Sequence, residues 1–133
     1  MADGVGKGGD MLSVLEIAVF ALVLSASSPS ATVEPFVCVS DRLGGVNCTN
    51  GHAASPGKDG NIHFRGGITV IKDRRLGVLR FSNGINARMD SSSWVQFSTG
   101  LSSQRNSDGS FRFNNGFVCR QETVDKARCE KAR

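Results

Sequence analysis

A repeat of 16 or 17 residues runs through the chain from residue 36 to its end and limits the folds that it can adopt. The six consecutive units span residues 36–51, 52–67, 68–84, 85–100, 101–116 and 117–133. Five units end in Gly, and three residues before each of these glycines stands Phe or Cys. We therefore expect every unit to form the same local structure, with neighbouring units sharing one core.

The pattern inside each unit predicts two short strands. Apolar and polar residues alternate with a period of two, which is typical of a strand with one buried face. Turn residues such as Asn83-Gly84 and Asn115-Gly116 follow, and we expect them to accept positive φ angles. The sequence thus predicts an all-β fold of six two-strand repeats. We favour a β-solenoid over an antiparallel meander or barrel, because stacking identical residues rewards a fixed spacing.

Two positions in each unit compensate each other in volume. In the four middle units a small residue is matched with Phe: Ala54 with Phe64, Val70 with Phe81, Ala87 with Phe97, and Ser103 with Phe113. In the first and last units both positions are Cys. Because a bonded pair of cysteines fills a similar space, we predict the disulfides Cys38–Cys48 and Cys119–Cys129. They would staple the two end units, which have one neighbour each in an open stack.

Residues 11–26 are apolar apart from Glu16 and two serines, and they predict a hydrophobic helix. This length fits the core of an export signal better than a bilayer span, which needs about 20 residues. We expect residues 1–31 to be a cleaved signal peptide or, alternatively, a retained membrane anchor with its linker, and residues 32–133 to be the β-repeat domain. A helix buried within the protein is a third reading, which the lack of a polar face disfavours.

Basic residues dominate the repeat region. Residues 1–31 hold one Lys and three acidic residues, so the remainder has 15 basic and 9 acidic side chains and a net charge of +6. Alternation places Arg and Gln side chains of the last four units on the outer face, where rows of planar donors can bind carboxylates, sulfates or phosphates. The candidate binding residues are Arg80, Gln96, Arg112, Arg128, Arg88, Gln104, Arg120 and the outward-facing Trp94.

No catalytic motif stands in the chain, and we expect neither an enzyme nor a cofactor. His52 has an inward position and His63 an outward one, so no shared metal site is expected. Aspartates such as Asp59 and Asp108 stand in predicted turns, where they accept local backbone hydrogen bonds.

These features predict a secreted, periplasmic or cell-surface binding module for an anionic glycan, another anionic polymer or a protein partner; nucleic acid is not among the expected partners. The alternative is a membrane-anchored structural or accessory subunit of a larger complex, or a fibre-forming element. It would use residues 11–26 as an anchor and open strand edges as its docking surface.

Overall fold

The computed structural model describes residues 14–26, 33–41, 43–73, 75–90 and 94–132. They form one helix, α2 (Val14–Ser25), and twelve strands: β1 (Phe36–Ser40), β2 (Val46–Cys48), β3 (Ala53–Pro56), β4 (Ile62–Phe64), β5 (Thr69–Asp73), β6 (Val78–Phe81), β7 (Asn86–Met89), β8 (Trp94–Phe97), β9 (Ser102–Arg105), β10 (Phe111–Phe113), β11 (Phe117–Thr123) and β12 (Lys126–Lys131). Each repeat unit contributes two consecutive strands. The predicted all-β class with an N-terminal hydrophobic helix is confirmed.

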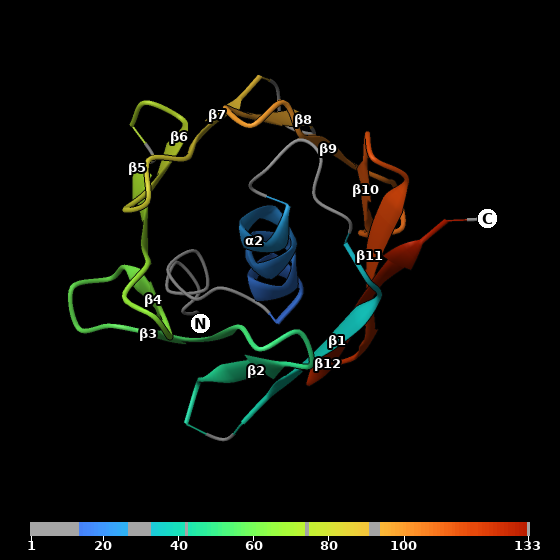
Figure 1. The fold of residues 1–133 in the computed structure, drawn as a ribbon, viewed down its shortest axis with the longest axis horizontal. Coiled ribbons are helices and arrows are strands. Elements are labelled where there is room, and N and C mark those ends of the chain that lie inside the picture. Colours follow the sequence, from blue (N-terminus) through green and yellow to red (C-terminus); the bar gives the residue numbers. More distant parts are fainter. Residues whose placement is uncertain (1–13, 27–32, 42, 74, 91–93, 133) are drawn as a thin grey trace, which may run out of the picture.

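The strands form a closed antiparallel barrel, in which each strand pairs with its neighbours in the sequence and β1 pairs with β12 (Figure 1). The predicted solenoid is therefore wrong. The barrel forms because connections of a few residues reverse the chain and place consecutive strands in antiparallel hairpins. A solenoid would instead pair each strand with the equivalent strand of the next unit.

One turn recurs between units and explains the periodic glycines. In the turn after β6, the Phe81 N–H donates to the Ile85 carbonyl over 2.8 Å, and the Gly84 N–H donates to the Phe81 carbonyl over 3.0 Å. Gly84 has a φ of 99°. Asn83 does not share this conformation, because in the described residues only glycines have positive φ. Its side-chain oxygen instead accepts the Ile85 N–H over 3.2 Å, which corrects the expectation for the Asn of these turns.

The pairs that compensate in volume are direct partners on adjacent strands. Ala54 faces Phe64, Val70 faces Phe81, Ala87 faces Phe97, and Ser103 faces Phe113. All of these side chains are buried inside the barrel. The two Cys pairs occupy the same register, and the predicted disulfides Cys38–Cys48 and Cys119–Cys129 are both confirmed.

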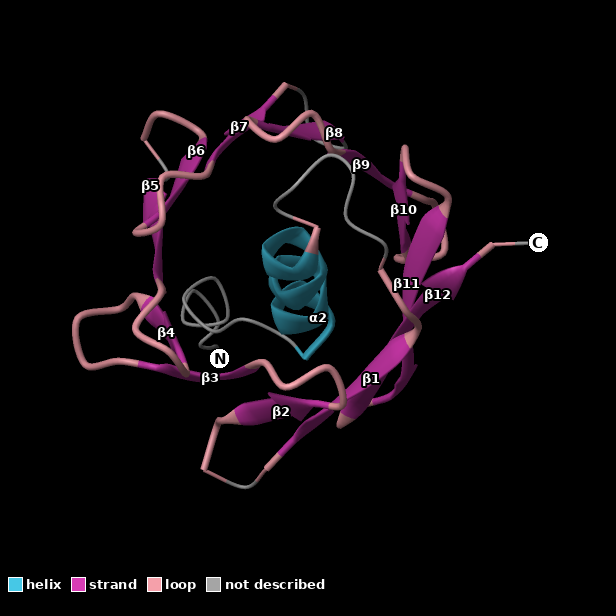
Figure 2. Cartoon of the chain, viewed as in Figure 1, coloured by secondary structure: helices cyan, strands magenta, loops and turns pink. Residues whose placement is uncertain are grey.

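Helix α2 lies inside the barrel (Figures 1 and 2). A barrel of about 8 strands is filled by its own side chains, whereas a wider one leaves a lumen that needs other content. From Val14 to Leu24, all residues except Glu16 are buried. A helix surrounded by barrel wall needs no polar face, so the missing polar face did not argue against burial. No helix in the described part of the chain is long and apolar enough to cross a membrane.

Residues 1–13 and 27–32, which include the start of the segment 11–26 and most of the linker before the β-repeat domain, lie outside the described residues. Removal of residues 1–31 as a signal peptide, or their retention as an anchor, stays a prediction.

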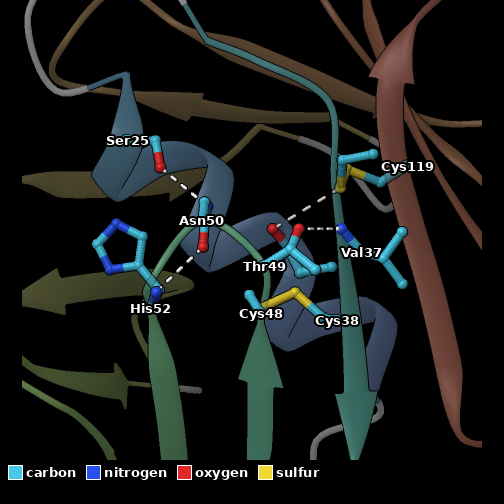
Figure 3. Close-up of a disulfide and its surroundings, with 10 residues drawn as sticks. Ser25, Val37, Cys38, Cys48, Thr49, Asn50, His52 and Cys119 are labelled. Atoms are coloured by element: carbon cyan, nitrogen blue, oxygen red, sulfur yellow. Dashed lines mark hydrogen bonds between the residues drawn. A yellow bond between two sulfur atoms is a disulfide. The ribbon is translucent and has the colours of Figure 1, made fainter.

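The two disulfides flank the seam at which the barrel closes. Cys38–Cys48 joins β1 to β2, Cys119–Cys129 joins β11 to β12, and the β1–β12 pairing lies between them. The end units therefore have two neighbours each, not one as in an open stack. Figure 3 shows the first disulfide and, at the C-terminal end of α2, the Asn50 side-chain amide that donates to Ser25 Oγ over 3.1 Å.

Candidate functional site

The outward positions of each unit are direct cross-strand neighbours on the barrel's outer face. The six pairs are Val39 with Asn47, Ser55 with His63, Ile71 with Arg80, Arg88 with Gln96, Gln104 with Arg112, and Arg120 with Arg128. Of the candidate binding residues, Gln104 and Arg128 are half-buried, and the other six are exposed. Arg and Gln are thus concentrated on β6 to β12.

Three of these candidates share one groove. Arg80, Arg88 and Gln96 line an open groove of about 620 Å³ that crosses β6, β7 and β8, and Asn86 and Ser98 complete its polar lining. We call these five residues the outer groove. Among the described residues neither guanidinium has a side-chain partner, whereas the Gln96 amide donates to Asp90 over 3.1 Å. Both guanidinium groups and the Gln96 amide can therefore donate to one ligand here.

The other candidates do not join the outer groove. Arg128 is already bonded, because its Nε donates to Glu122 over 2.7 Å. This hydrogen bond lowers the pKa of Glu122 and raises the pKa of Arg128. Trp94, 39% exposed, lies beside Gln104 at the start of β8.

Arg120 lines a cavity together with Asp108, and the two side chains interact electrostatically. The candidate residues are distributed around half of the wall, so they do not form one continuous patch.

The turn aspartates Asp59 and Asp108 accept local backbone hydrogen bonds, as the sequence predicts. Asp59 accepts the Asn61 N–H over 3.0 Å and lies 3.1 Å from His63 Nε2. The backbone hydrogen bond and the His63 contact lower the pKa of Asp59. Asp108 accepts the Ser110 N–H over 2.9 Å and the Ser110 hydroxyl over 2.6 Å, and these bonds lower its pKa.

The two histidines lie in different surroundings. His52 packs edge-on against Phe64, with ring centroids 6.3 Å apart, and burial lowers its pKa. His63 is exposed on the outer face. Across the described residues, no group of three or more His, Cys, Asp or Glu side chains could hold a metal ion.

Sequence reasoning missed a second feature, a cavity inside the barrel. A space of about 310 Å³ lies between α2 and the wall and is lined by apolar side chains from both, together with Glu16, Lys72 and Arg105. The only signal in the sequence was the single charged residue within the hydrophobic segment. It indicates a site only once the helix is known to lie in the lumen.

Comparison with known proteins found no matching family model, no similar curated protein and no matching solved structure.

Proposed function

We propose that this protein is an exported, non-enzymatic binding module that holds an anionic polymer, such as a sulfated glycan, in the outer groove. The observation that carries the proposal is the presence of Arg80 and Arg88 in one groove, without side-chain partners among the described residues. A protein partner with an acidic surface would use the same contacts.

The spacing of these donors suits a repeating anion. Arg88 and Gln96 are direct partners on β7 and β8, while Arg80 on β6 is paired with Asn86, two residues before Arg88. Neighbouring strands lie about 4.8 Å apart, so the donors form a short diagonal row. Each guanidinium can bind a sulfate or carboxylate through two parallel hydrogen bonds. A polymer that carries successive anions would engage the row more tightly than a single ion.

The test is retention on immobilised heparin in a salt gradient. We expect the protein to elute well above physiological ionic strength of about 0.15 M. The double variant Arg80→Gln/Arg88→Gln removes both groove guanidiniums and should elute much earlier. The control Arg65→Gln/Arg75→Gln removes the same charge from exposed residues outside the outer groove and should shift elution little. Equal shifts in the two double variants would reduce the binding to general charge and contradict the proposal.

The disulfides point to an oxidising compartment, because cytosolic thiols are kept reduced. Export itself is part of the proposal. Sequencing the N-terminus of the native protein tests the route. A start near Ser27 or Thr32 would support a cleaved signal peptide, and an intact Met1 or Met11 would support retention of the helix.

The alternative of a fibre-forming or docking element loses its main premise. It required open strand edges at the end units, but β1 and β12 pair with each other. Membrane anchoring through residues 11–26 stays a prediction that no observation in the structure favours.

A further inference from the structure

Helix α2 fills only part of the barrel lumen. It packs against β11, β12, β1 and β2, which form the wall on both sides of the seam. The cavity of about 310 Å³ lies on the opposite side of the helix, against strands β5 to β10. Its apolar walls include Val19 and Phe20 of the helix and Leu79, Val95 and Phe97 of the barrel. We call this space the inner cavity; its volume is at the lower end for small-molecule sites, which begin at about 300 Å³.

The inner cavity adjoins a second, more polar one. The outer cavity has a volume of about 450 Å³ and shares Glu16, Arg105 and Phe111 with the inner cavity. Its further lining includes Ser110, Arg120 and Gln121. The two spaces therefore meet at Arg105, whose guanidinium lies 5.7 Å from the centre of the Phe111 ring.

Positive charge predominates around the two cavities. The charged lining residues are Lys72, Arg105 and Arg120 on the basic side, and Glu16 and Asp108 on the acidic side. Lys72 is paired with Glu16 over 3.4 Å, while Asp108 accepts the Ser110 hydroxyl over 2.6 Å and also interacts electrostatically with Arg120, which leaves Arg105 as the excess positive charge. Arg105 and Arg120 can donate to an anionic group in the outer cavity, while most of the inner cavity wall is apolar.

We propose that the protein binds a fatty acid, with its alkyl chain in the inner cavity and its carboxylate in the outer cavity near Arg105 and Arg120. The apolar walls favour each methylene that leaves water, and the guanidinium groups fix the direction in which the chain enters. This site is separate from the outer groove, because Arg80 and Arg88 line neither cavity. The two binding activities can therefore fail independently.

Isothermal titration calorimetry with octanoate, decanoate and dodecanoate tests the proposal. The experiment uses full-length protein, below the micelle concentration of each probe, and an intact mass confirms that α2 is present. We expect one binding site per chain and an affinity that rises about fourfold per methylene until the inner cavity is filled. Dodecyltrimethylammonium, which has the same tail and the opposite charge, should bind at least about tenfold more weakly.

Two variants test the contacts of the alkyl chain and of the carboxylate separately. Arg105→Gln should weaken dodecanoate binding by about tenfold, whereas the matched control Arg65→Gln, at an exposed residue that lines neither cavity nor the outer groove, should leave it unchanged. Val95→Trp should fill the inner cavity and abolish dodecanoate binding. If this variant does not fold, the effect of Arg105→Gln on dodecanoate affinity still tests the proposal. Absence of dodecanoate binding, equal effects of the two Arg variants, or equal binding of the cationic probe would overturn the proposal.

Discussion

Cysteine takes the place of the small residue and its Phe partner in the two units whose strands pack along the helix at the seam. Cys129 Sγ lies 3.9 Å from the carbonyl oxygen of Ala18, and both residues are fully buried. The wall opposite carries Phe97, which lines the inner cavity. A disulfide projects less far than a Phe ring, so the seam units leave room for α2. Volume compensation within a unit is therefore only part of the reason for Cys at these positions.

Because Cys129 contacts the helix, the disulfide of the last unit should not be replaceable by the Ala–Phe pair of a middle unit. The variant Cys119→Ala/Cys129→Phe copies the Ala87–Phe97 pair but would push a ring into α2. We expect it to be less stable than Cys119→Ala/Cys129→Ala by about 1–3 kcal/mol, the usual cost of overpacking. Urea denaturation measures the difference in the free energy of unfolding. A more stable Phe variant would show that pairing within the unit outweighs the helix contact.

His52 makes the stability of the protein depend on pH. Burial lowers its pKa in the folded state below the ordinary value of 6.5. As pH falls below about 6.5, the unfolded chain binds the proton first, so folding loses stability until the folded pKa is passed. Three exposed carboxyls with lowered pKa values affect stability only at lower pH. Their stabilisation of the folded state is lost as pH falls through their folded pKa values; they are Asp59, Asp108 and Glu122.

We expect the free energy of unfolding to decrease between about pH 7.5 and about pH 5.5, and His52→Phe to reduce that decrease. The variant keeps a ring against Phe64 and cannot titrate. Denaturant titrations of both proteins at the two pH values make the comparison. An equal pH dependence in both proteins would assign the effect to other groups.

At the level of elements, α2 and the strands form one hydrophobic core. The Phe20 ring of the helix lies edge-on to Phe81 of β6, with centroids 5.8 Å apart, and Phe81 in turn lies 6.4 Å from Phe97. Glu16 and Ser25 bond to the wall near opposite ends of the helix, through Lys72 and Asn50. The helix is thus held along its whole length by the barrel.

A double-mutant cycle tests this arrangement in solution. Phe20→Leu and Phe81→Leu should couple by about 0.5–1.5 kcal/mol, as aromatic pairs in contact do. The control cycle of Phe20→Leu with Phe113→Leu should show almost no coupling, since no contact between these rings is described. Zero coupling in both cycles would mean that α2 does not occupy the lumen, as a cleaved signal peptide would require.

For the whole molecule, the β1–β12 pairing is the only strand pairing in the described residues that joins distant parts of the chain. It aligns Phe36 with Cys129 and Val39 with Lys126, whereas every other pairing joins strands that are consecutive in sequence. Closing so long a loop is entropically costly, and the flanking disulfides restrict both closing hairpins before they meet. The barrel should therefore open first at this seam.

Reduction of the disulfides tests that expectation. Each bond contributes about 2–3 kcal/mol in the chain-entropy model, so the reduced protein should lose protection against amide hydrogen exchange first in β1 and β12. The hairpin of β6 and β7 lies across the barrel and serves as the internal control. A uniform loss of protection in both regions would contradict a weak seam.

The outward residues show how far sequence could go towards the candidate site. Alternation correctly placed Arg80, Arg88 and Gln96 on the outer face. It could not tell that these three share a groove while Arg128 is bonded to Glu122. Those facts depend on the register between strands and on turn conformations, which the repeat pattern does not specify.

The sequence by itself determined the two-strand units, the turns, the side chains that face inwards and the disulfide partners. All of these depend on contacts within about 17 residues, which the period of the repeat records directly. Only the tertiary structure decided that β1 meets β12, that α2 lies in the lumen and that a cavity remains beside it. These features join distant segments and depend on the width of a twelve-strand barrel, for which the spacing of residues within one unit carries no signal.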